Sequence, residues 1–306
     1  MRAGVVDLGT NSTRLLVADV EDGRVEEVAR RAEITRLGEG VDERRKLLPL
    51  PIARVRNVLT DYRRELERLG AERVLTIATS AVRDAENGEA FLGEIEWSYG
   101  FTTRLLSGDE EAALTLRGVA TGEPVGEGTL VLDVGGGSTE LITTEQRVSL
   151  DVGSVRVTER HLHSDPPTAD ELEAAAREVR ELLPPLQPSG AIGVAGTVTT
   201  LAALELGGYD PERVHGYRLS SEAVERQLER LASLPLAQRR ELPGLEPDRA
   251  PVIVGGAVIV REVLKRYGLY ALEASERDLL HGAALEAAEL PSPVEGDAPP
   301  GAYTCC

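Results

Sequence analysis

The chain has 306 residues, 42% of them hydrophobic and 28% charged, and its 34 Lys and Arg against 52 Asp and Glu give a formal net charge of −18. This composition excludes disordered, collagen-like and disulfide-stapled proteins, and the length suggests about two domains. A charge this negative disfavours nucleic acid and anionic membranes, so we expect neither as a partner. We see no secretion signal and no apolar run long enough to span a bilayer, which predicts a cytoplasmic location.

The first half is predicted to open with three strands, near residues 4–8, 15–18 and 25–28. Apolar residues at helical spacing then predict a helix over Ile52–Leu69, which Gly70 ends. The elements expected after it are a strand over Arg73–Ala78, a helix from Ser80, a strand over Phe101–Leu106 and a helix to about Ala120.

The second half repeats this succession after a Gly- and Pro-containing linker, Thr121–Gly128. Short apolar runs at 130–132 and 141–142 predict its first two strands. The further expected elements are strands near Val148–Val152, Ala191–Ala195 and Tyr270–Glu273 and helices near Val155–His161, Ala169–Leu183, Val198–Leu206, Ser221–Leu231, Val252–Arg266 and Asp278–Leu290.

An internal repeat links the two halves. The segment Asp7-Leu-Gly-Thr-Asn-Ser-Thr-Arg-Leu-Leu shares Asp, Gly, Ser, Thr and Leu, at the same offsets, with Asp133-Val-Gly-Gly-Gly-Ser-Thr-Glu-Leu-Ile. Each copy is predicted to be strand, tight turn, strand. We therefore expect an α/β protein of two related domains with mixed five-stranded sheets, residues 1–124 and 125–290, and an interdomain cleft into which both turns point. Residues 291–306, which end in Cys305 and Cys306, are predicted to be a disordered tail.

The Gly-rich turns are candidate anion sites, because successive backbone N–H groups in such a turn form a concavity for an anion. The simpler alternative is that hairpins need glycine in any case. A carboxylate beside a phosphate is repulsive unless a cation lies between them. Asp7 and Asp133 are therefore candidate ligands of Mg²⁺, with Mn²⁺ as a substitute.

The helix after Leu106 begins with carboxylates. Ser107 and Glu110 fit a capping box, which makes Glu110 structural and leaves Glu111 as a candidate general base. The alternative for Glu111 is a carboxylate favoured by the helix dipole. Arg83, in a first helical turn, indicates an anion at that helix start or else a surface arginine. The small-residue turns around Gly153, Ser154, Arg156 and Thr197 are weaker candidates for substrate contacts.

Taken in order, six motifs resemble those of the Ppx/GppA phosphatase family, within the actin/sugar-kinase/Hsp70 (actin-like ATPase, ribonuclease H-like) fold superfamily, over about residues 3–290. They are the two repeat segments, Ile34-Thr-Arg-Leu-Gly-Glu-Gly-Val, Ala78-Thr-Ser-Ala-Val-Arg, Leu106-Ser-Gly-Asp-Glu-Glu-Ala-Ala and Gly153-Ser-Val-Arg. Two positions depart from the pattern of short members. Pro251 replaces an acidic residue, and His281 stands where an acidic residue precedes Gly.

The resemblance implies Mg²⁺-assisted hydrolysis of terminal phosphoanhydrides, with Glu111 and Glu140 as the catalytic carboxylates. It implies phosphate contacts at Arg83 and along both turns, which makes Thr10, Asn11, Ser12, Gly136, Gly137 and Ser138 candidate substrate-binding residues. We expect an exopolyphosphatase that releases orthophosphate from inorganic polyphosphate, short chains above all because of the net charge. The alternatives are a guanosine pentaphosphate phosphohydrolase, a kinase or ATPase of the same fold, and a non-catalytic polyphosphate or alarmone sensor. A homodimer is the default assembly.

Overall fold

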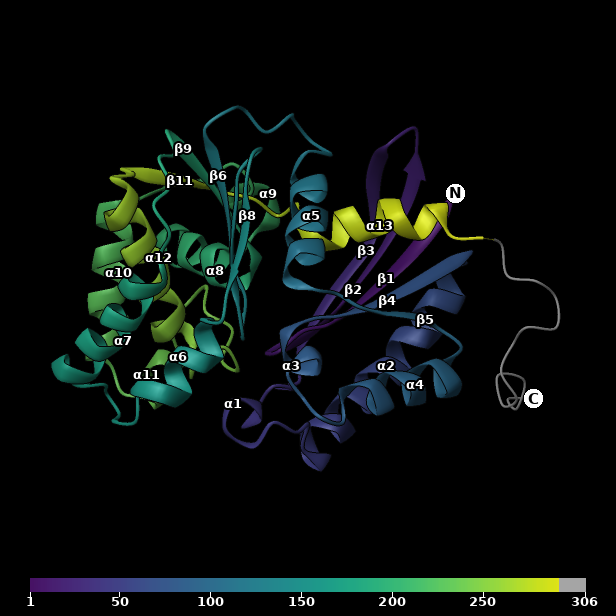
Figure 1. Cartoon of the computed structure of the whole chain (residues 1–306), viewed down its shortest axis with the longest axis horizontal. Coiled ribbons are helices and arrows are strands. Elements are labelled where there is room, and N and C mark those ends of the chain that lie inside the picture. Colours follow the sequence, from purple (N-terminus) through teal and green to yellow (C-terminus); the bar gives the residue numbers. More distant parts are fainter. Residues whose placement is uncertain (292–306) are drawn as a thin grey trace. The chain divides into compact units, whose positions relative to one another are not determined.

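The structure is a computed structural model that describes residues 1–291. The chain divides into two compact units (Figure 1). The first contains Met1–Glu123 together with the segment from Leu279 onward, and the second contains Pro124–Asp278. The change from the first unit to the second falls inside the predicted linker. The predicted tail from residue 292 on, with both cysteines, lies outside the described residues.

The first unit alternates strands and helices much as the sequence predicts, with α1 as an addition and the helix from Ser80 divided in two. Its elements are β1 (Arg2–Leu8), β2 (Ser12–Glu21), β3 (Arg24–Ile34), α1 (Val41–Arg44), α2 (Pro49–Leu69), β4 (Arg73–Ala78), α3 (Ser80–Arg83), α4 (Gly88–Tyr99), β5 (Thr102–Leu105), α5 (Gly108–Val119) and α13 (Leu279–Glu289). The sheet order is β3-β2-β1-β4-β5. Strand β2 is antiparallel to both neighbours, and β4 is parallel to β1 and β5.

Both faces of the first sheet are covered, which explains why β1 is an almost unbroken apolar run. Alternate residues along a strand point to opposite faces. Val6 and Leu8 therefore pack in the core that α2 and α4 complete, whereas Ala3 and Val5 pack in a second core with α13. The sheet is thus fixed on both sides, and the turn that follows β1 extends from a rigid base.

The last helix, α13, departs from the predicted domain boundaries. It was expected in the second domain, but it packs against α5 and the first sheet (Figure 1). Gly282 permits this close approach, since a Cβ there would lie 1.9 Å from the carbonyl oxygen of Leu114. His281 is buried in the same unit, with Nε2 3.0 Å from Oε1 of Glu27 on β3. This position therefore belongs to the first unit and not to the second, where sequence order placed it.

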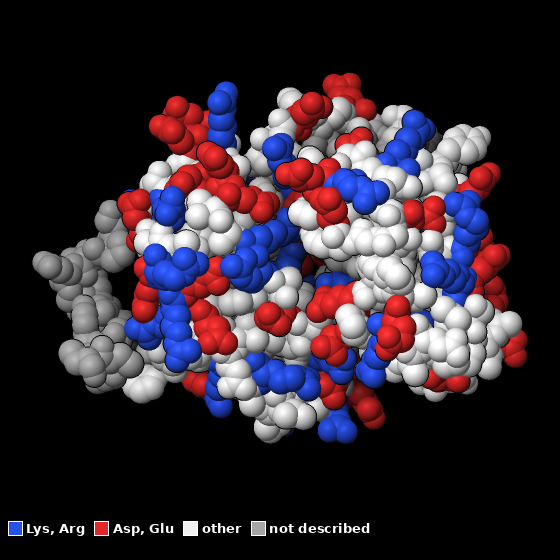
Figure 2. Space-filling model, turned by 180° about the vertical axis from the view of Figure 1, so that it is seen from behind, with Lys and Arg blue, Asp and Glu red and all other residues white. Residues whose placement is uncertain are grey.

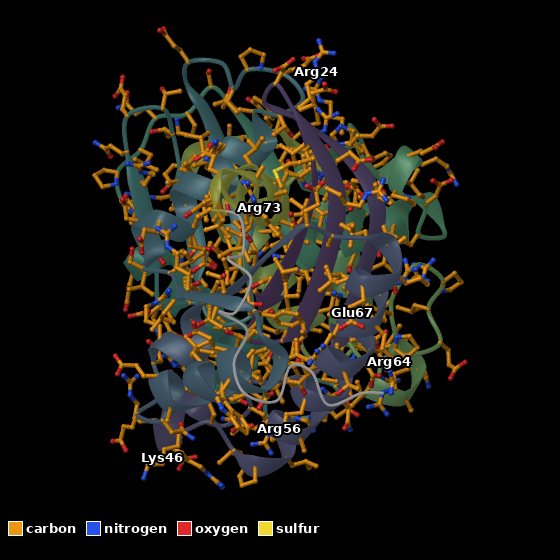
Figure 3. The ribbon with its side chains drawn as sticks, turned by 90° about the vertical axis from the view of Figure 1, so that its right-hand side faces the viewer. Arg24, Lys46, Arg56, Arg64, Glu67 and Arg73 are labelled. Atoms are coloured by element: carbon orange, nitrogen blue, oxygen red, sulfur yellow. The ribbon has the colours of Figure 1, made fainter. Side chains whose placement is uncertain are left out.

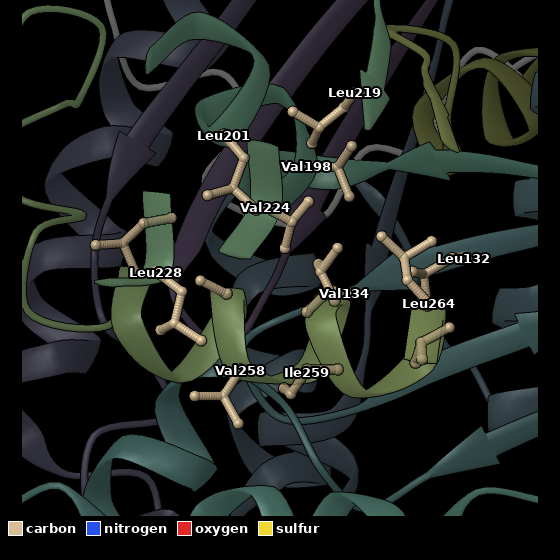
Figure 4. Packing of buried hydrophobic residues seen from close by; sticks show 14 of the residues in the cluster. Leu132, Val134, Val198, Leu201, Leu219, Val224, Leu228, Val258, Ile259 and Leu264 are labelled. Atoms are coloured by element: carbon tan, nitrogen blue, oxygen red, sulfur yellow. The ribbon is translucent and has the colours of Figure 1, made fainter. Parts of the chain in front are cut away.

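The second unit is built in the same way. Its elements are β6 (Thr129–Val134), β7 (Thr139–Ile142), β8 (Arg147–Leu150), α6 (Ser154–His161), α7 (Ala169–Leu182), β9 (Gly190–Val194), α8 (Ala195–Leu206), α9 (Pro211–Val214), β10 (Arg218–Ser220), α10 (Ser221–Ser233), α11 (Leu236–Arg239), α12 (Ile253–Tyr267) and β11 (Ala271–Ala274). Figure 4 shows its core, where Val258, Ile259 and Leu264 of α12 lie among side chains from the sheet, α8 and α10.

The two sheets share one topology. Within residues 1–291, the second sheet has six strands in the order β10-β11-β9-β6-β7-β8, so β8, β7, β6, β9 and β11 repeat the order of the first sheet. The sixth strand, β10, pairs antiparallel with β11 at the edge. It was not predicted, because three residues are too few for an alternating pattern to be visible in the sequence. The two-domain α/β fold class of the prediction is confirmed, with this one strand added.

Across residues 1–291, no helix combines the length and the apolar character that a membrane span requires.

Candidate functional site

Each unit carries one copy of the repeated turn, and the two copies close in the same way. The N–H of Gly9 donates to the carbonyl of Ser12 over 3.0 Å, and the N–H of Gly135 donates to the carbonyl of Ser138 over 3.1 Å. Each turn follows the central strand of its sheet, β1 or β6, and leads into the antiparallel neighbour. The repeat therefore predicted one local structure, and the structure has it twice.

The first turn holds a polar side chain that lacks a protein partner. Asn11 is 6% exposed, and within the described residues neither Oδ1 nor Nδ2 of its amide has a hydrogen-bond partner. A buried amide without partners is costly, and such groups mark sites where a ligand or water completes the bonding. Thr10 beside it is also buried, whereas Ser12 is half-buried. Asn11 is therefore the strongest ligand candidate in this turn.

The second turn is held by the helix that follows β8. The N–H groups of Ser154 and Val155, at the start of α6, donate to the carbonyls of Gly135 and Gly136 over 2.9 and 2.8 Å. Gly153 lies so close that a Cβ would be 2.5 Å from the carbonyl carbon and oxygen of Gly136. Gly153 and Ser154 were predicted to contact substrate, which stays a prediction. The structure shows that the backbone at the start of α6 positions the turn.

Arg156 also binds the backbone of the second turn, and Thr197 binds the end of β6, the strand before the turn. The N–H of Arg156 donates to the carbonyl of Gly136 over 3.3 Å, and Oγ1 of Thr197 donates to the carbonyl of Val134 over 3.3 Å. Ala195, which begins α8, has a φ of 64°, a left-handed backbone that alanine seldom adopts. The region around the second turn is thus tightly built, and side-chain contacts of Ser154, Arg156 and Thr197 with substrate stay predictions.

The carboxylates at the ends of β1 and β6 have opposite surroundings. Asp7 lies across from Arg14 in the strand pair, and Oδ2 of Asp7 accepts a hydrogen bond from Nε of Arg14 over 2.8 Å. Asp133 lies across from Glu140 at the equivalent position of the second unit. The first carboxylate therefore lies opposite a guanidinium in its strand pair, and the second lies opposite another carboxylate.

The hairpin of the second unit is a candidate place for a metal ion. Asp133 and Glu140 are both buried, and Oε1 of Glu140 accepts a hydrogen bond from Oγ of Ser149 over 2.8 Å. No group of three or more Asp, Glu, His or Cys that could hold a metal ion occurs among residues 1–291. Mg²⁺ is bound in proteins by one or two carboxylates, with water or phosphate oxygens filling the other positions. The carboxylate pair fits that pattern, and Asp7, whose Oδ2 is bound by Arg14, stays a predicted ligand.

The start of α5 separates a structural glutamate from a candidate catalytic one, as the sequence predicts. Ser107 and Glu110 form the capping box, in which Oε2 of Glu110 accepts from the N–H of Ser107 over 2.8 Å. This bond, with those from Arg104 and the Ser107 hydroxyl, lowers the pKa of Glu110 to about 2. Glu111 is buried, and its Oε2 lies 3.4 Å from NH1 of Arg83. Because NH1 of Arg83 also donates to the carbonyl of Leu106 over 2.8 Å, the guanidinium is fixed on the strand end that precedes α5.

The structure thus groups the predicted residues by unit. In the first unit Arg83 and Glu111 are paired, and Thr10 and Asn11 form the turn after β1. In the second unit Asp133, Glu140 and the Gly136–Ser138 turn share one hairpin. Sequence reasoning missed the contact of Asp7 with Arg14, although the register of a tight hairpin places residues 7 and 14 opposite one another.

This combination defines a class of protein: a two-unit α/β protein with the same tight turn after a central strand of each sheet and a carboxylate held beside a guanidinium. Comparison with known proteins gives the family. The model of the Ppx/GppA phosphatase family matches residues 16–290, and this chain belongs to that family.

The similarity to individual relatives extends over nearly the whole chain. Exopolyphosphatase 2 of Mycobacterium tuberculosis is 41% identical, over 94% of this chain and 98% of that protein. A solved exopolyphosphatase-like protein superposes with a TM-score of 0.87 at 33% identity, covering 94% of this chain and 99% of its own. The Ppx/GppA family member of Aquifex aeolicus superposes with a TM-score of 0.77 at 31% identity, covering 94% and 98%.

Proposed function

We propose that this protein is an exopolyphosphatase that hydrolyses the terminal phosphoanhydride bond of inorganic polyphosphate. The observation that carries the proposal is the pairing of Glu111 with Arg83, a buried carboxylate 3.4 Å from a guanidinium that is itself anchored to a backbone carbonyl. A general base and a phosphate ligand are both needed for attack by water on a phosphoryl group. The 41% identity to an exopolyphosphatase supports the same conclusion.

In the proposed reaction a water oxygen forms a bond to the terminal phosphorus, and the bridging P–O bond breaks. Orthophosphate and a polyphosphate one unit shorter are the products. Oε of Glu111 takes the proton of the attacking water, and Arg83 neutralises negative charge on the terminal phosphoryl oxygens. The amide of Asn11 and the backbone N–H groups of the second turn bind phosphate oxygens.

Magnesium is part of the proposal. Asp133 and Glu140 would hold the ion, with phosphate oxygens and water completing its coordination. When bound, Mg²⁺ would supply positive charge to the phosphate oxygens and cancel the repulsion between these carboxylates and the substrate. Asp7, whose Oδ2 is bound by Arg14, stays a predicted ligand and is not part of this pair.

The charge of the whole chain bears on the length of the substrate. A protein of net charge −18 repels a long polyanion, so binding has to depend on local groups such as Arg83. On the face that Figure 2 shows, Lys and Arg are interspersed with Asp and Glu. We therefore propose short polyphosphate as the preferred substrate.

The test is orthophosphate release with Mg²⁺ from short polyphosphate, long polyphosphate, guanosine pentaphosphate and ATP, each at the same concentration of terminal phosphate. The proposal predicts the highest kcat/KM on short polyphosphate. A preference for guanosine pentaphosphate would move the protein to the alternative reaction of the family resemblance. Binding of polyphosphate without release from any substrate would overturn the hydrolase proposal in favour of a sensor. A homodimer stays a proposal, which light scattering of the purified protein would decide.

A further inference from the structure

The first turn is held by a loop that the mechanism does not use. The N–H of Arg36 donates to the carbonyl of Asn11 over 2.9 Å, and the N–H of Gly38 donates to the carbonyl of Thr10 over 2.8 Å. The backbone carbonyls of Thr10 and Asn11 thereby have hydrogen-bond partners, while the side-chain amide of Asn11 has none among the described residues. The segment Thr35–Glu39, which we call the bracing loop, thus fixes the backbone from which that amide extends.

In the second unit a helix, α6, holds the equivalent turn. There the first N–H groups of α6 donate to the carbonyls of Gly135 and Gly136. A helix supplies such donors in a ready orientation because its first N–H groups have no partner within the helix. The bracing loop belongs to no helix or strand, so contacts with other elements have to fix its backbone conformation.

Two features show that the bracing loop is a demanding conformation. Arg36 has a φ of 50°, in the left-handed region that side chains other than glycine seldom adopt. Gly38 packs so tightly on the turn that a Cβ would lie 2.2 Å from Cγ2 of Thr10 and 3.2 Å from its carbonyl oxygen. A backbone of this kind persists when surrounding contacts determine it.

Arg54 of α2 supplies those contacts. Its Nε donates to the carbonyl of Thr35 over 2.7 Å and its NH2 to the carbonyl of Arg36 over 3.4 Å, while NH2 also donates to Oε2 of Glu39 over 2.7 Å. One guanidinium therefore donates to three groups of the bracing loop, two backbone carbonyls and one carboxylate. The planar fork of arginine can do this, whereas the point charge of lysine cannot.

Helix α2 also reaches the strand that follows the turn. The hydroxyl of Tyr62 donates to the carbonyl of Thr13 over 2.9 Å, and Oγ1 of Thr13 is 2.9 Å from Oγ1 of Thr35. The same helix thus contacts the bracing loop and β2, the strand into which the turn leads. An isolated surface ion pair contributes little to stability. The hydrogen bonds of Arg54 to two backbone carbonyls of the bracing loop are therefore the contacts that can fix its shape.

We propose that Arg54 is a positioning residue of the phosphate site: by holding the bracing loop it fixes Thr10 and Asn11 so that the Asn11 amide meets a phosphate oxygen. The inference rests on the proposed function, in which Asn11 binds substrate. Arg54 touches no reacting atom, so its loss should weaken binding of the phosphate chain equally in the ground state and the transition state. Such a loss raises KM and leaves kcat near its original value.

The experiment measures kcat and KM on short polyphosphate with Mg²⁺ for Arg54→Met, Arg54→Lys, Asn11→Ala and the double variant Arg54→Met with Asn11→Ala. Arg56→Met is the matched control. Arg56 lies on the same helix (Figure 3) and pairs with Glu94 over 2.6 Å, and within residues 1–291 its side chain makes no hydrogen bond or ion pair with the bracing loop. The Tm of every variant is measured as well, so that the stability lost with an ion pair can be separated from a change in KM.

We expect Asn11→Ala to raise KM about 10–100-fold, as the loss of a hydrogen bond to a charged group does. Arg54→Met should raise KM about 5–20-fold with kcat within about 3-fold of wild type, and Arg54→Lys should restore little of this. Adding Arg54→Met to Asn11→Ala should raise KM less than about 2-fold further, because the amide that it positions is gone. Arg56→Met should leave both constants unchanged.

A second variant reaches the loop without touching Arg54. Gly38→Ala forces Cβ against Thr10 and should raise KM in the same range, again without a further effect in the Asn11→Ala background. The inference is overturned if Arg54→Met and Gly38→Ala leave KM unchanged, or if their effects multiply with that of Asn11→Ala. Failure of the proposed function is a different result, namely no phosphate release by the wild-type protein from any of the substrates.

Discussion

Replacing Gly153 by alanine tests whether the start of α6 positions the second turn. Gly153 has φ −145° and ψ 170°, an extended backbone open to any residue, so the substitution introduces no backbone strain. Its effect is steric. The new Cβ would lie 2.5 Å from the carbonyl carbon and oxygen of Gly136 and 2.7 Å from the carbonyl carbon of Gly137.

The magnitude follows from these distances. Ordinary contacts begin at 3.4 Å, so the turn and the helix have to separate by about 1 Å, and both are backbone. Overpacking of this kind costs about 1–3 kcal/mol, which corresponds to a fall in Tm of about 2–10 °C for a unit of this size. A displacement of about 1 Å at groups that orient a substrate reduces turnover about 100-fold. We therefore expect a larger loss of kcat/KM than the loss of stability suggests.

The assay pairs thermal unfolding with phosphate release, and Gly93→Ala is the control. Gly93 is exposed in α4, and a Cβ there would meet nothing within 4 Å, so alanine should stabilise the protein by about 0.5–1 kcal/mol through its better helix propensity. Wild-type Tm and turnover in Gly153→Ala would refute the reasoning, because the contact with the turn would then have no mechanical consequence.

Three further outcomes are expected. Glu111→Gln should lower kcat about 10²–10⁴-fold with KM within about 3-fold, measured by steady-state phosphate release, and wild-type turnover would remove Glu111 as the base. Asp133→Asn should raise the Mg²⁺ concentration for half-maximal activity about 10–100-fold in a titration from chelator-treated protein, and an unchanged midpoint would exclude the proposed ligand. The capping-box bond from the Ser107 N–H, with the bonds from Arg104 and the Ser107 hydroxyl, lowers the pKa of Glu110 from 4.5 to about 2, so its carboxylate stabilises the fold above pH about 4.5 and loses that contribution as the pH falls toward 2. The Tm difference between wild type and Glu110→Gln should therefore close over that interval, and a difference independent of pH would contradict the capping-box account.

Much of the fold could be predicted from the sequence because local signals and the repeat agree. The helix over Ile52–Leu69 has a clear apolar face and a terminal Gly70, and the observed α2 differs from it at one end. The place of α13 could not be predicted in this way. The apolar pattern of α13 predicts a helix that packs on a sheet but does not say which sheet. Sequence order favours the sheet of the second unit, whereas α13 packs on that of the first.

The candidate site was predictable where a motif carries chemistry in adjacent residues. The capping box identifies Glu110 as structural, so Glu111 stands out one residue later, as the structure has it. The contacts of Arg54 were not predictable, because its partners are backbone carbonyls, which leave no trace in the sequence. The left-handed Arg36 gave no signal either, since arginine is not a residue that favours this conformation.

The return of α13 to the first unit has a consequence for synthesis of the chain. The second unit, Pro124–Asp278, is continuous, and its whole sequence is synthesised before α13 and leaves the ribosome ahead of it. The first sheet, although its strands are synthesised earliest, lacks the α13 part of the cover over Ala3, Val5 and Leu16 until Leu279–Glu289 emerges. The unit that begins first is thus completed last, and a nascent chain halted before residue 279 presents an apolar sheet face to chaperones.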